Sequence, residues 1–189
     1  MQYHGFAGEY QAQMVVDATY SAPSSKQFKV VSQTGSPFVI NHIFKRLMES
    51  EKEFISDANR TQTALNMQNY NFTMAGYDSG PNGGEYVLNI FPRKNNRFLY
   101  RGKIWVDAND FAVVRIEAQP SESPSFWIKK TEIEHKYQKV DGFWLPAWDH
   151  TVSEMRLGGQ ANLSIEYRDY HITKAAEFRG IERARAGSR

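Results

Sequence analysis

The order of apolar and polar residues predicts a β-hairpin near the start of the chain. Val, Thr and Tyr are frequent in residues 9–20, and a second run of this kind occupies residues 28–33. A turn-like stretch at 21–25, rich in Ser with one Pro, separates the two runs. β-branched and aromatic residues on both sides of a short turn are typical of two paired strands.

A helix is predicted directly after the hairpin. Ser36 suits the position before the first helical turn, and Pro37 suits the first position of the helix. The apolar residues that follow recur every three or four positions, so they share one side of a helix that lies on an apolar surface. This stripe consists of Ile40, Ile43, Phe44, Leu47, Met48, Phe54 and Ile55.

Residues 69–171 predict seven short strands separated by turns. Turn clusters at 78–84, 107–110 and 158–159 interrupt the strand-like runs. Turns this short leave no room for the crossover connections that parallel strands need. The pattern therefore favours an antiparallel meander, and with the helix it predicts a mainly β fold of the α+β type.

Two of the turns predict how three of these strands pair. If Asp141-Gly142 is a two-residue turn, Val140 lies opposite Phe143. The same count places Tyr137 opposite Pro146, His135 opposite Trp148, Ile133 opposite His150 and Thr131 opposite Val152. Counted in the same way, the Gly158-Gly159 turn places Val152 opposite Ile165 and His150 opposite Tyr167.

These registers predict one aromatic face and one polar face. Since side chains alternate along a strand, such a contrast is typical of a sheet that is covered on one side only. The aromatic face is expected to carry Trp127, Ile133, Tyr137, Trp144, Trp148, Val152, Leu163, Ile165 and Tyr167, with Trp105 nearby. The polar face is expected to carry Lys130, Glu132, Glu134, Lys136, Asp149, Ser153, Ser164 and Glu166, with Leu145 and Met155 as apolar exceptions.

The composition excludes several classes of protein. The 189 residues include 12 Phe, 10 Tyr and 4 Trp, which excludes a disordered chain, and no apolar run reaches the ~18 residues of a membrane-spanning helix. A net charge of +2 argues against a duplex nucleic-acid binder, and zero Cys excludes disulfides and thiol chemistry. We expect one domain at residues 1–174 and a flexible Arg-rich tail at 175–189.

No catalytic or metal-binding motif is found. The five His residues lack metal-ligand spacing, and there is no phosphate-binding loop or nucleophile elbow. Asp149 and His150 are neighbours in a strand and therefore point to opposite faces. His135 and His150 are expected on the aromatic face, where packed or rim histidines are the default and ligand contacts the alternative. We assign no catalytic residue and expect neither a cofactor nor a metal.

The aromatic face itself allows two interpretations. As a structural core, its rings would be buried beneath the helix at 37–56. As a binding surface, they would line a partly open apolar groove that takes an acyl chain.

Several segments resemble the LolA-like outer-membrane lipoprotein-sorting family. They are YVLNIFPRK at 86–94, RFLYRGKIWVD at 97–107, FAVVRIE at 111–117, PSFWI at 124–128 and GFWLP at 142–146. The most specific stretch is RGKIWVDANDFAVVRIE at 101–117, because the family places a W-x-D strand end and a tight turn there. The resemblance extends from Tyr10 to Ile172.

The resemblance implies a curved antiparallel sheet that forms an incomplete β-barrel with an amphipathic helix over its concave face. Such proteins carry acyl chains of lipoproteins or lipids through the periplasm toward the outer membrane, without catalysis. Inner-membrane donor proteins, outer-membrane acceptor proteins and transient membrane contact are the partners it implies. The cavity candidates are the ten aromatic-face residues named above, including Trp105, under a helical lid of Ile40, Ile43, Phe44, Leu47 and Met48.

Family members begin with a signal peptide and a helix before the first strand. The sequence MQYHGFAG at the start of this chain has neither feature, so we expect that these two segments are missing from it.

Two other functions stay open on the sequence. A cell-envelope sensor or ligand-binding module of the same fold would bind a lipid or peptide but transfer nothing. An enzyme that uses His135 and His150 would need both imidazoles to meet a carboxylate in one pocket.

Overall fold

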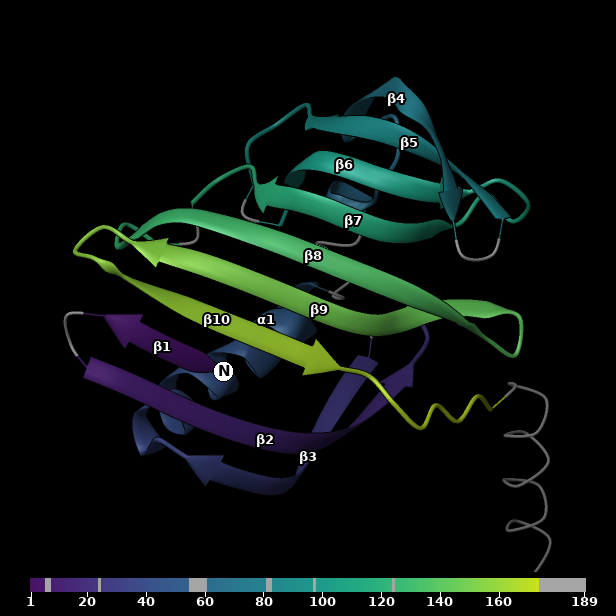
Figure 1. The fold of residues 1–189 in the computed structure, drawn as a ribbon. Helices are drawn as coiled ribbons and strands as arrows, with labels where there is room; N and C mark the ends of the chain where they lie inside the picture. The colour runs from purple at the N-terminus through teal and green to yellow at the C-terminus, as the bar shows by residue number, and fades with distance from the viewer. Residues whose placement is uncertain are drawn as a thin grey trace, which may run out of the picture.

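The computed structural model describes residues 1–5, 8–23, 25–54, 61–80, 83–96, 98–123 and 125–173. Within these residues the protein is mainly β, as the sequence predicts (Figure 1). Ten strands form one antiparallel sheet, and a short helical segment follows the third of them. The first strand was not expected in addition to the hairpin and the seven-stranded meander. The expected tail at 175–189 and the last stripe residue, Ile55, lie outside the described residues. The strands are β1 (Gln2–Gly5), β2 (Gly8–Ser21), β3 (Ser25–Gly35), β4 (Tyr70–Gly80), β5 (Gly83–Pro92), β6 (Tyr100–Asp107), β7 (Val113–Pro120), β8 (Ile128–Val140), β9 (Phe143–Met155) and β10 (Gly159–Glu166).

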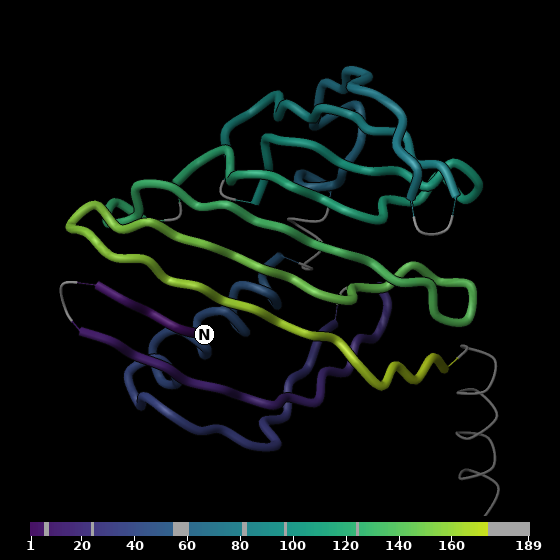
Figure 2. Tube along the Cα trace, in the orientation of Figure 1, coloured from purple at the N-terminus to yellow at the C-terminus, as the bar shows by residue number. Residues whose placement is uncertain are grey.

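Strands β4 to β10 form the predicted seven-stranded meander, because they follow one another across the sheet in chain order. The N-terminal strands extend the same sheet, since β1 pairs with β10 from Gln2 opposite Asn162 to Gly5 opposite Gly159. The full order is β3-β2-β1-β10-β9-β8-β7-β6-β5-β4. Strands β3 and β4 lie at its two ends and do not pair with each other among the described residues, so the sheet is unclosed (Figure 2).

The predicted hairpin and the helix after it are both confirmed. Strands β2 and β3 pair from Ser21 opposite Ser25 to Ala12 opposite Gly35. Helical winding begins directly after Ser36, whose carbonyl accepts the N–H of Ile40 at 3.1 Å. The segment is a π-helix, η1 (Val39–Phe44), that continues as an α-helix, α1 (Lys45–Phe54).

The helical segment is deeply buried only in its π-helical part. Val39, Ile40 and Phe44 form an apolar cluster with Ala12 of β2, which we call the N-terminal core. No residue of α1 is buried to the same degree. The half-buried residues around this core include Tyr10, Met14, Ile43 and Leu163.

A second and larger apolar cluster lies under strands β4 to β7. We call it the meander core, and its buried members are Tyr70, Ile90, Leu99, Ile104, Ile116 and Ala118. The half-buried residues packed against it include Phe72, Leu88 and Tyr137. Strands β8 to β10 therefore lie between two separate cores.

The pairing of β8 with β9 agrees with the prediction only near the turn. Val140 lies opposite Phe143 and Tyr137 opposite Pro146, as expected for a two-residue turn. A bulge at Ala147 then shifts the register, so that Lys136 lies opposite Trp148 and His135 opposite Asp149. The predicted partners His135–Trp148, Ile133–His150 and Thr131–Val152 are therefore wrong, because a bulge sets two residues against one and reverses the alternation beyond it.

The predicted pairing of β9 with β10 is also wrong. Val152 lies opposite Asn162 and His150 opposite Ser164, rather than opposite Ile165 and Tyr167. The reason is that the turn between β9 and β10 is centred on Leu157 and not on the two glycines. Gly158 and Gly159, which take positive φ values, both follow this centre.

Together the two shifts exchange the faces of one strand. Each shift moves the register by an odd number of residues. The side chains of β8 and β10 that were expected to share a face therefore still share it, whereas each side chain of β9 after the bulge lies on the face opposite to the predicted one. Trp148 and Val152 leave the predicted aromatic face, and Asp149 and Ser153 enter it. We call the face that carries Asp149 the inner face and the opposite one the outer face.

Candidate functional site

The inner face of β8 to β10 joins the two cores. On one side, Ile133 lies opposite Ala118 of the meander core, and on the other side Leu163 packs against the N-terminal core. Five of the ten predicted cavity residues lie on this face, and none of the five is fully buried. They are Ile133, Tyr137, Leu163, Ile165 and Tyr167.

A hydrogen-bonded group of polar side chains occupies the middle of the inner face. Asp149 Oδ1 lies 2.6 Å from His135 Nδ1, and Asp149 Oδ2 accepts the hydroxyl of Tyr167 at 2.6 Å. The side chains of His135 and Asp149 are 21% and 17% exposed. The ring of Tyr100 lies 6.0 Å from the His135 ring, at an interplanar angle of 58°. We use the name Asp149 cluster for Asp149, His135, Tyr167, Tyr100 and Tyr137.

The bulge residue positions Tyr167 in this cluster. The backbone N–H of Tyr167 donates to the carbonyl of Ala147 at 3.0 Å, which continues the pairing of β10 with β9 past Glu166. Tyr170 adds a second anchor, because its hydroxyl donates to the carbonyl of Pro146 at 2.7 Å. The chain after β10 is therefore tied to β9.

The tyrosines of the cluster are held in the protonated form. Burial raises the pKa of Tyr137 to about 12, and the negative charges of Asp149 and Glu51 raise it further. The pKa values of Tyr100 and Tyr167 are raised for the same main reason, with the hydrogen bond to Asp149 adding to the effect at Tyr167. At neutral pH these phenols are thus hydrogen-bond donors on a half-buried surface.

The helix brings a second carboxylate toward this face. The negative charge of Glu51 in α1 contributes to the raised pKa values of Tyr100, Tyr137 and Tyr167. Lys26 of β3 holds Glu51 in an ion pair of 2.7 Å. This pair links α1 to the edge of the sheet.

The histidines do not meet. His135 lies on the inner face, whereas His150 lies on the outer face and stacks on Trp148 at 5.3 Å between ring centroids. The ammonium of Lys136 lies 4.7 Å from the centroid of the Trp148 ring, and Ser164 Oγ lies 2.9 Å from His150 Nδ1. The convergence that an enzyme using both imidazoles would need is therefore not present in the described part of the chain.

Two other predicted cavity residues, Trp105 and Trp144, belong to a separate apolar cluster. Trp105 is 8% exposed and packs with Val87 and Val114, and the half-buried Trp144 packs against them. Both indoles donate to carboxylates, Trp105 to Asp78 at 3.0 Å and Trp144 to Asp110 at 2.8 Å.

Two further candidates also lie elsewhere. Trp127 precedes β8 and is 59% exposed. Val152 lies opposite Glu132 and Asn162, which places it on the outer face.

The predicted lid residues divide in the same way as the helical segment. Ile40 and Phe44 are buried in the N-terminal core, and Ile43 packs against it. Leu47 and Met48 in α1 are half-buried.

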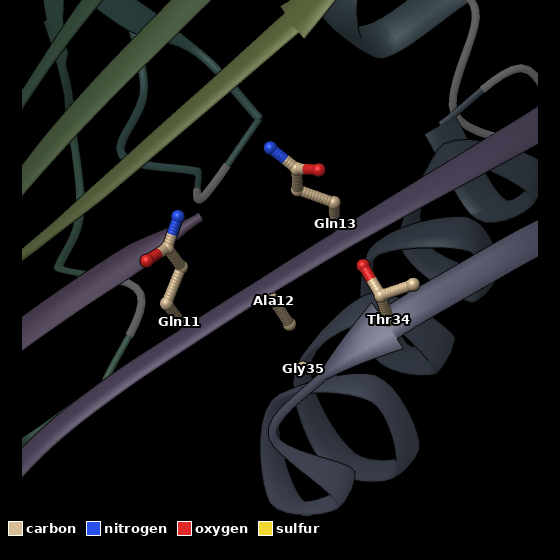
Figure 3. A pocket seen from close by; sticks show the side chains of 5 residues that line it. All are labelled: Gln11, Ala12, Gln13, Thr34 and Gly35. Carbon is tan, nitrogen blue, oxygen red and sulfur yellow. The ribbon is translucent and has the colours of Figure 1, made fainter.

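Two depressions of the surface are defined by described residues. The smaller, about 190 Å³, lies where β3 ends beside β2 and is lined by Gln11, Ala12, Gln13, Thr34 and Gly35 (Figure 3). The larger, about 440 Å³, lies beside the Asp141-Gly142 turn and includes Tyr137 of the Asp149 cluster. Its other lining residues are Asp107, Asn109, Asp110, Gln138, Lys139 and Trp144.

Asp149 and Tyr100 are the site residues that sequence reasoning missed. Asp149 was assigned to the polar face because the strand was read without a bulge, and Tyr100 lies at the first position of β6, outside the strands whose register was predicted. The signal for Asp149 was Pro146, since a Pro in a central strand lacks the N–H of a regular ladder and favours a bulge.

The described residues contain no group of three or more His, Asp or Glu side chains arranged to hold a metal ion. None of the helices in this part of the chain combines the length and apolar character needed to cross a bilayer. No protein-family model, curated protein or solved structure matches this chain.

Proposed function

We propose that this protein is a periplasmic carrier that binds acyl chains of lipoproteins or lipids on the inner face and delivers them toward the outer membrane. In this proposal the sheet is an incomplete barrel of the LolA-like kind. The segment η1–α1 covers part of its concave side. Inner-membrane donors and outer-membrane acceptors would load and unload the carrier, with only transient membrane contact.

The observation that carries the proposal is the incomplete burial of the inner face between the two cores. Ile133, Tyr137 and Ile165 are half-buried, whereas Ile116 and Ala118 in β7, the strand next to β8, are buried. The helical segment packs on β2 and β3, and Leu163 of β10 packs against the N-terminal core, to which this segment contributes Val39, Ile40 and Phe44. An apolar surface of this kind gains free energy when a chain of methylene groups covers it.

The expected gain is large enough for a carrier. Burial contributes ~0.8 kcal/mol per CH₂, so covering eight to ten carbons would contribute ~6–8 kcal/mol before ordering costs. Release would then require a membrane or an acceptor protein that offers the chain an equally apolar surface.

The Asp149 cluster supports a ligand that has a polar group next to its acyl chain. The hydroxyls of Tyr100 and Tyr137 form no hydrogen bond with another described residue, and they stay protonated at neutral pH. Ester and amide carbonyls are acceptors for such donors. A free carboxylate is a poorer match, because Asp149 and Glu51 already make this region negative.

A ligand-binding module or sensor of the same fold remains the second candidate. The specific observation in its favour is the polar Asp149 cluster in the middle of an apolar face, because such a cluster would select a ligand by its head group. Such a module would bind the same ligand but would not pass it to an acceptor membrane.

The first experiment is native mass spectrometry of the chain purified from a bacterial periplasm without detergent. We expect adducts with masses of acylated lipids. Ile133→Glu should abolish them, because a carboxylate would lie on the inner face. Trp148→Glu, on the outer face of the neighbouring strand, is the matched control and should keep them. A clean unliganded mass for the unmodified chain, together with unchanged tryptophan fluorescence on adding a lipopeptide, would contradict the proposal.

The second experiment separates the carrier from the sensor. Loaded protein is mixed with acceptor vesicles, and the transfer of a fluorescent lipopeptide is followed with time. Transfer supports a carrier, whereas binding without transfer supports the sensor.

A further inference from the structure

Three large apolar side chains project together at one end of the sheet. Phe126 and Trp127 precede β8, and Leu157 lies in the turn between β9 and β10. Their exposed fractions are 75%, 59% and 71%. We call these three residues the apolar tip. In Figure 1 the turn from β9 to β10 lies at that end of the sheet, on the left of the view.

Hydrogen bonds hold the apolar tip in place. The backbone N–H of Arg156 donates to the carbonyl of Trp127 at 2.9 Å, and Arg156 Nε donates to the carbonyl of Phe126 at 2.7 Å. The Arg156 guanidinium also lies 5.4 Å from the centroid of the Phe126 ring. The two aromatic rings meet edge to face at 5.5 Å. The tip is thus a preformed projection that joins two separate segments of the chain.

Positive charge accompanies the apolar side chains. Arg156 is exposed and forms no ion pair with a carboxylate among the described residues. Lys129 lies two residues after Trp127 and is exposed, with Glu154 at 3.3 Å. Aromatic and leucine side chains flanked by Arg and Lys are typical of segments that lie in the interface of a bilayer.

We propose that the apolar tip inserts into the interface of a bilayer that contains anionic phospholipids, with Arg156 and Lys129 contacting the phosphates. A lipid surface fits this geometry better than a protein partner does. The three side chains form a projection at a turn, and a projection enters a fluid layer without needing a matching hollow. The guanidinium that holds the tip carries the charge complementary to the head groups.

This inference goes beyond acyl binding, because it uses other residues at another place in the fold. The tip lies at the end of β8 and β9, whereas the proposed ligand face is centred on Asp149. Loss of one property should therefore leave the other intact.

The first test is co-sedimentation of the full chain with vesicles of phosphatidylethanolamine and phosphatidylglycerol. The double variant Phe126→Ser, Leu157→Ser should reduce the partition coefficient at least about tenfold, since it removes apolar groups that would enter the interface. The matched control is Phe111→Ser, which removes a side chain that is 73% exposed in the turn between β6 and β7. This control should bind vesicles like the unmodified chain and, like the double variant, keep its acyl adducts in native mass spectrometry.

A second test uses Trp127 as a depth reporter and does not depend on the double variant. Vesicles with brominated acyl chains should quench the fluorescence of the unmodified chain. Trp127→Phe should lose most of this quenching but keep most of its binding, because the other tryptophans lie outside the tip and Phe retains an aromatic ring.

Several results would overturn the inference. They are equal binding by the double variant, an equal loss in the Phe111→Ser control, equal binding to vesicles of phosphatidylcholine alone, or unchanged bromine quenching in Trp127→Phe. A dimer that forms in solution and is abolished by the double variant would assign the tip to contact with a second copy instead.

Discussion

The region under β4 to β7 and the inner face of β8 to β10 belong to one sheet but are built differently. In the first, Ile90, Ile104 and Leu99 are almost completely buried, and the hydroxyl of the buried Tyr70 accepts the N–H of Tyr100. In the second, Ile133 and Ile165 are half-buried beside an ionisable pair. The border runs between two neighbouring strands, since Ile116 of β7 lies directly opposite His135 of β8.

The first region is a fully packed core. The second leaves apolar side chains half-exposed and would gain free energy if a ligand covered them. A close-packed cluster has its stability in contacts that already exist. A half-buried face with polar groups leaves apolar area uncovered, and that area is available to a ligand. The comparison leads to four predictions, which run from the largest expected effect to the smallest.

The largest loss of stability is expected in the meander core. Ile90→Ala should lower the free energy of unfolding by about 3 kcal/mol, because Ile90 is 0% exposed and its removal leaves a cavity. Urea denaturation measures this loss. Ile133→Ala on the inner face is the comparison and should cost less than half as much. Equal losses would mean that the two regions are packed alike.

The second prediction concerns alkaline pH. Tyr137 has a pKa of about 12, above its ordinary value of 10.0, and the pKa values of Tyr100 and Tyr167 are also raised. The folded state thus favours the protonated phenols, so their contribution to stability is complete below pH 10 and is lost as the pH rises toward 12 and above.

Denaturant midpoints measured across this pH range check that prediction. Tyr137→Phe should flatten the dependence, because it removes one of the titrating groups. Tyr20→Phe, in an exposed side chain of β2, is the control and should leave it unchanged. An identical pH dependence in Tyr137→Phe would show that this phenol does not ionise differently on unfolding.

The third prediction breaks the polar cluster of the inner face. Asp149→Asn should lower the free energy of unfolding by about 1.5–2 kcal/mol, the scale of hydrogen bonds to a charged group. It should also lower the pKa of Tyr137, because it removes one of the negative charges that raise it. Titration of phenolate absorbance measures the second effect. A raised pKa of Tyr137 in the variant would contradict the assigned cause.

The smallest effect is expected on the outer face. Lys136→Gln removes the ammonium that lies over Trp148 and the ion pair with Glu134 at 3.0 Å, and it should cost less than about 1 kcal/mol. Thermal unfolding at low and high salt would measure it. A loss as large as that of Asp149→Asn would show that the outer contacts are not screened by solvent.

Much of the fold could be predicted from the sequence because it depends on local patterns. Alternation and short turns gave the seven-stranded meander, and a Ser-Pro pair marked the start of the helix. The Asp141-Gly142 turn gave the first pairings of β8 with β9. All of these features are determined by residues close together in the chain.

The composition of the inner face could not be predicted in the same way. It depends on which residues of β9 lie opposite β8 and β10. The bulge at Ala147 and the turn centred on Leu157 each shift one of these two pairings by an odd number of residues, and an odd shift moves a side chain to the other face. Ile133 and Ile165 were nevertheless assigned to the same face, because the two odd shifts cancel across three strands. Trp148 was assigned to the wrong face because it lies in β9, which the bulge alone shifts relative to β8.

The bulge at Ala147 also has an evolutionary consequence. It amounts to a one-residue insertion whose effect is confined to the pairing with β8, since the Ala147 carbonyl still accepts the N–H of Tyr167, which directly follows β10. A further insertion directly after Ala147, with no second bulge to absorb it, would exchange Trp148 and Asp149 between the two faces. The side chains that lie on the inner face are therefore determined by the number of residues in this strand as much as by their identity.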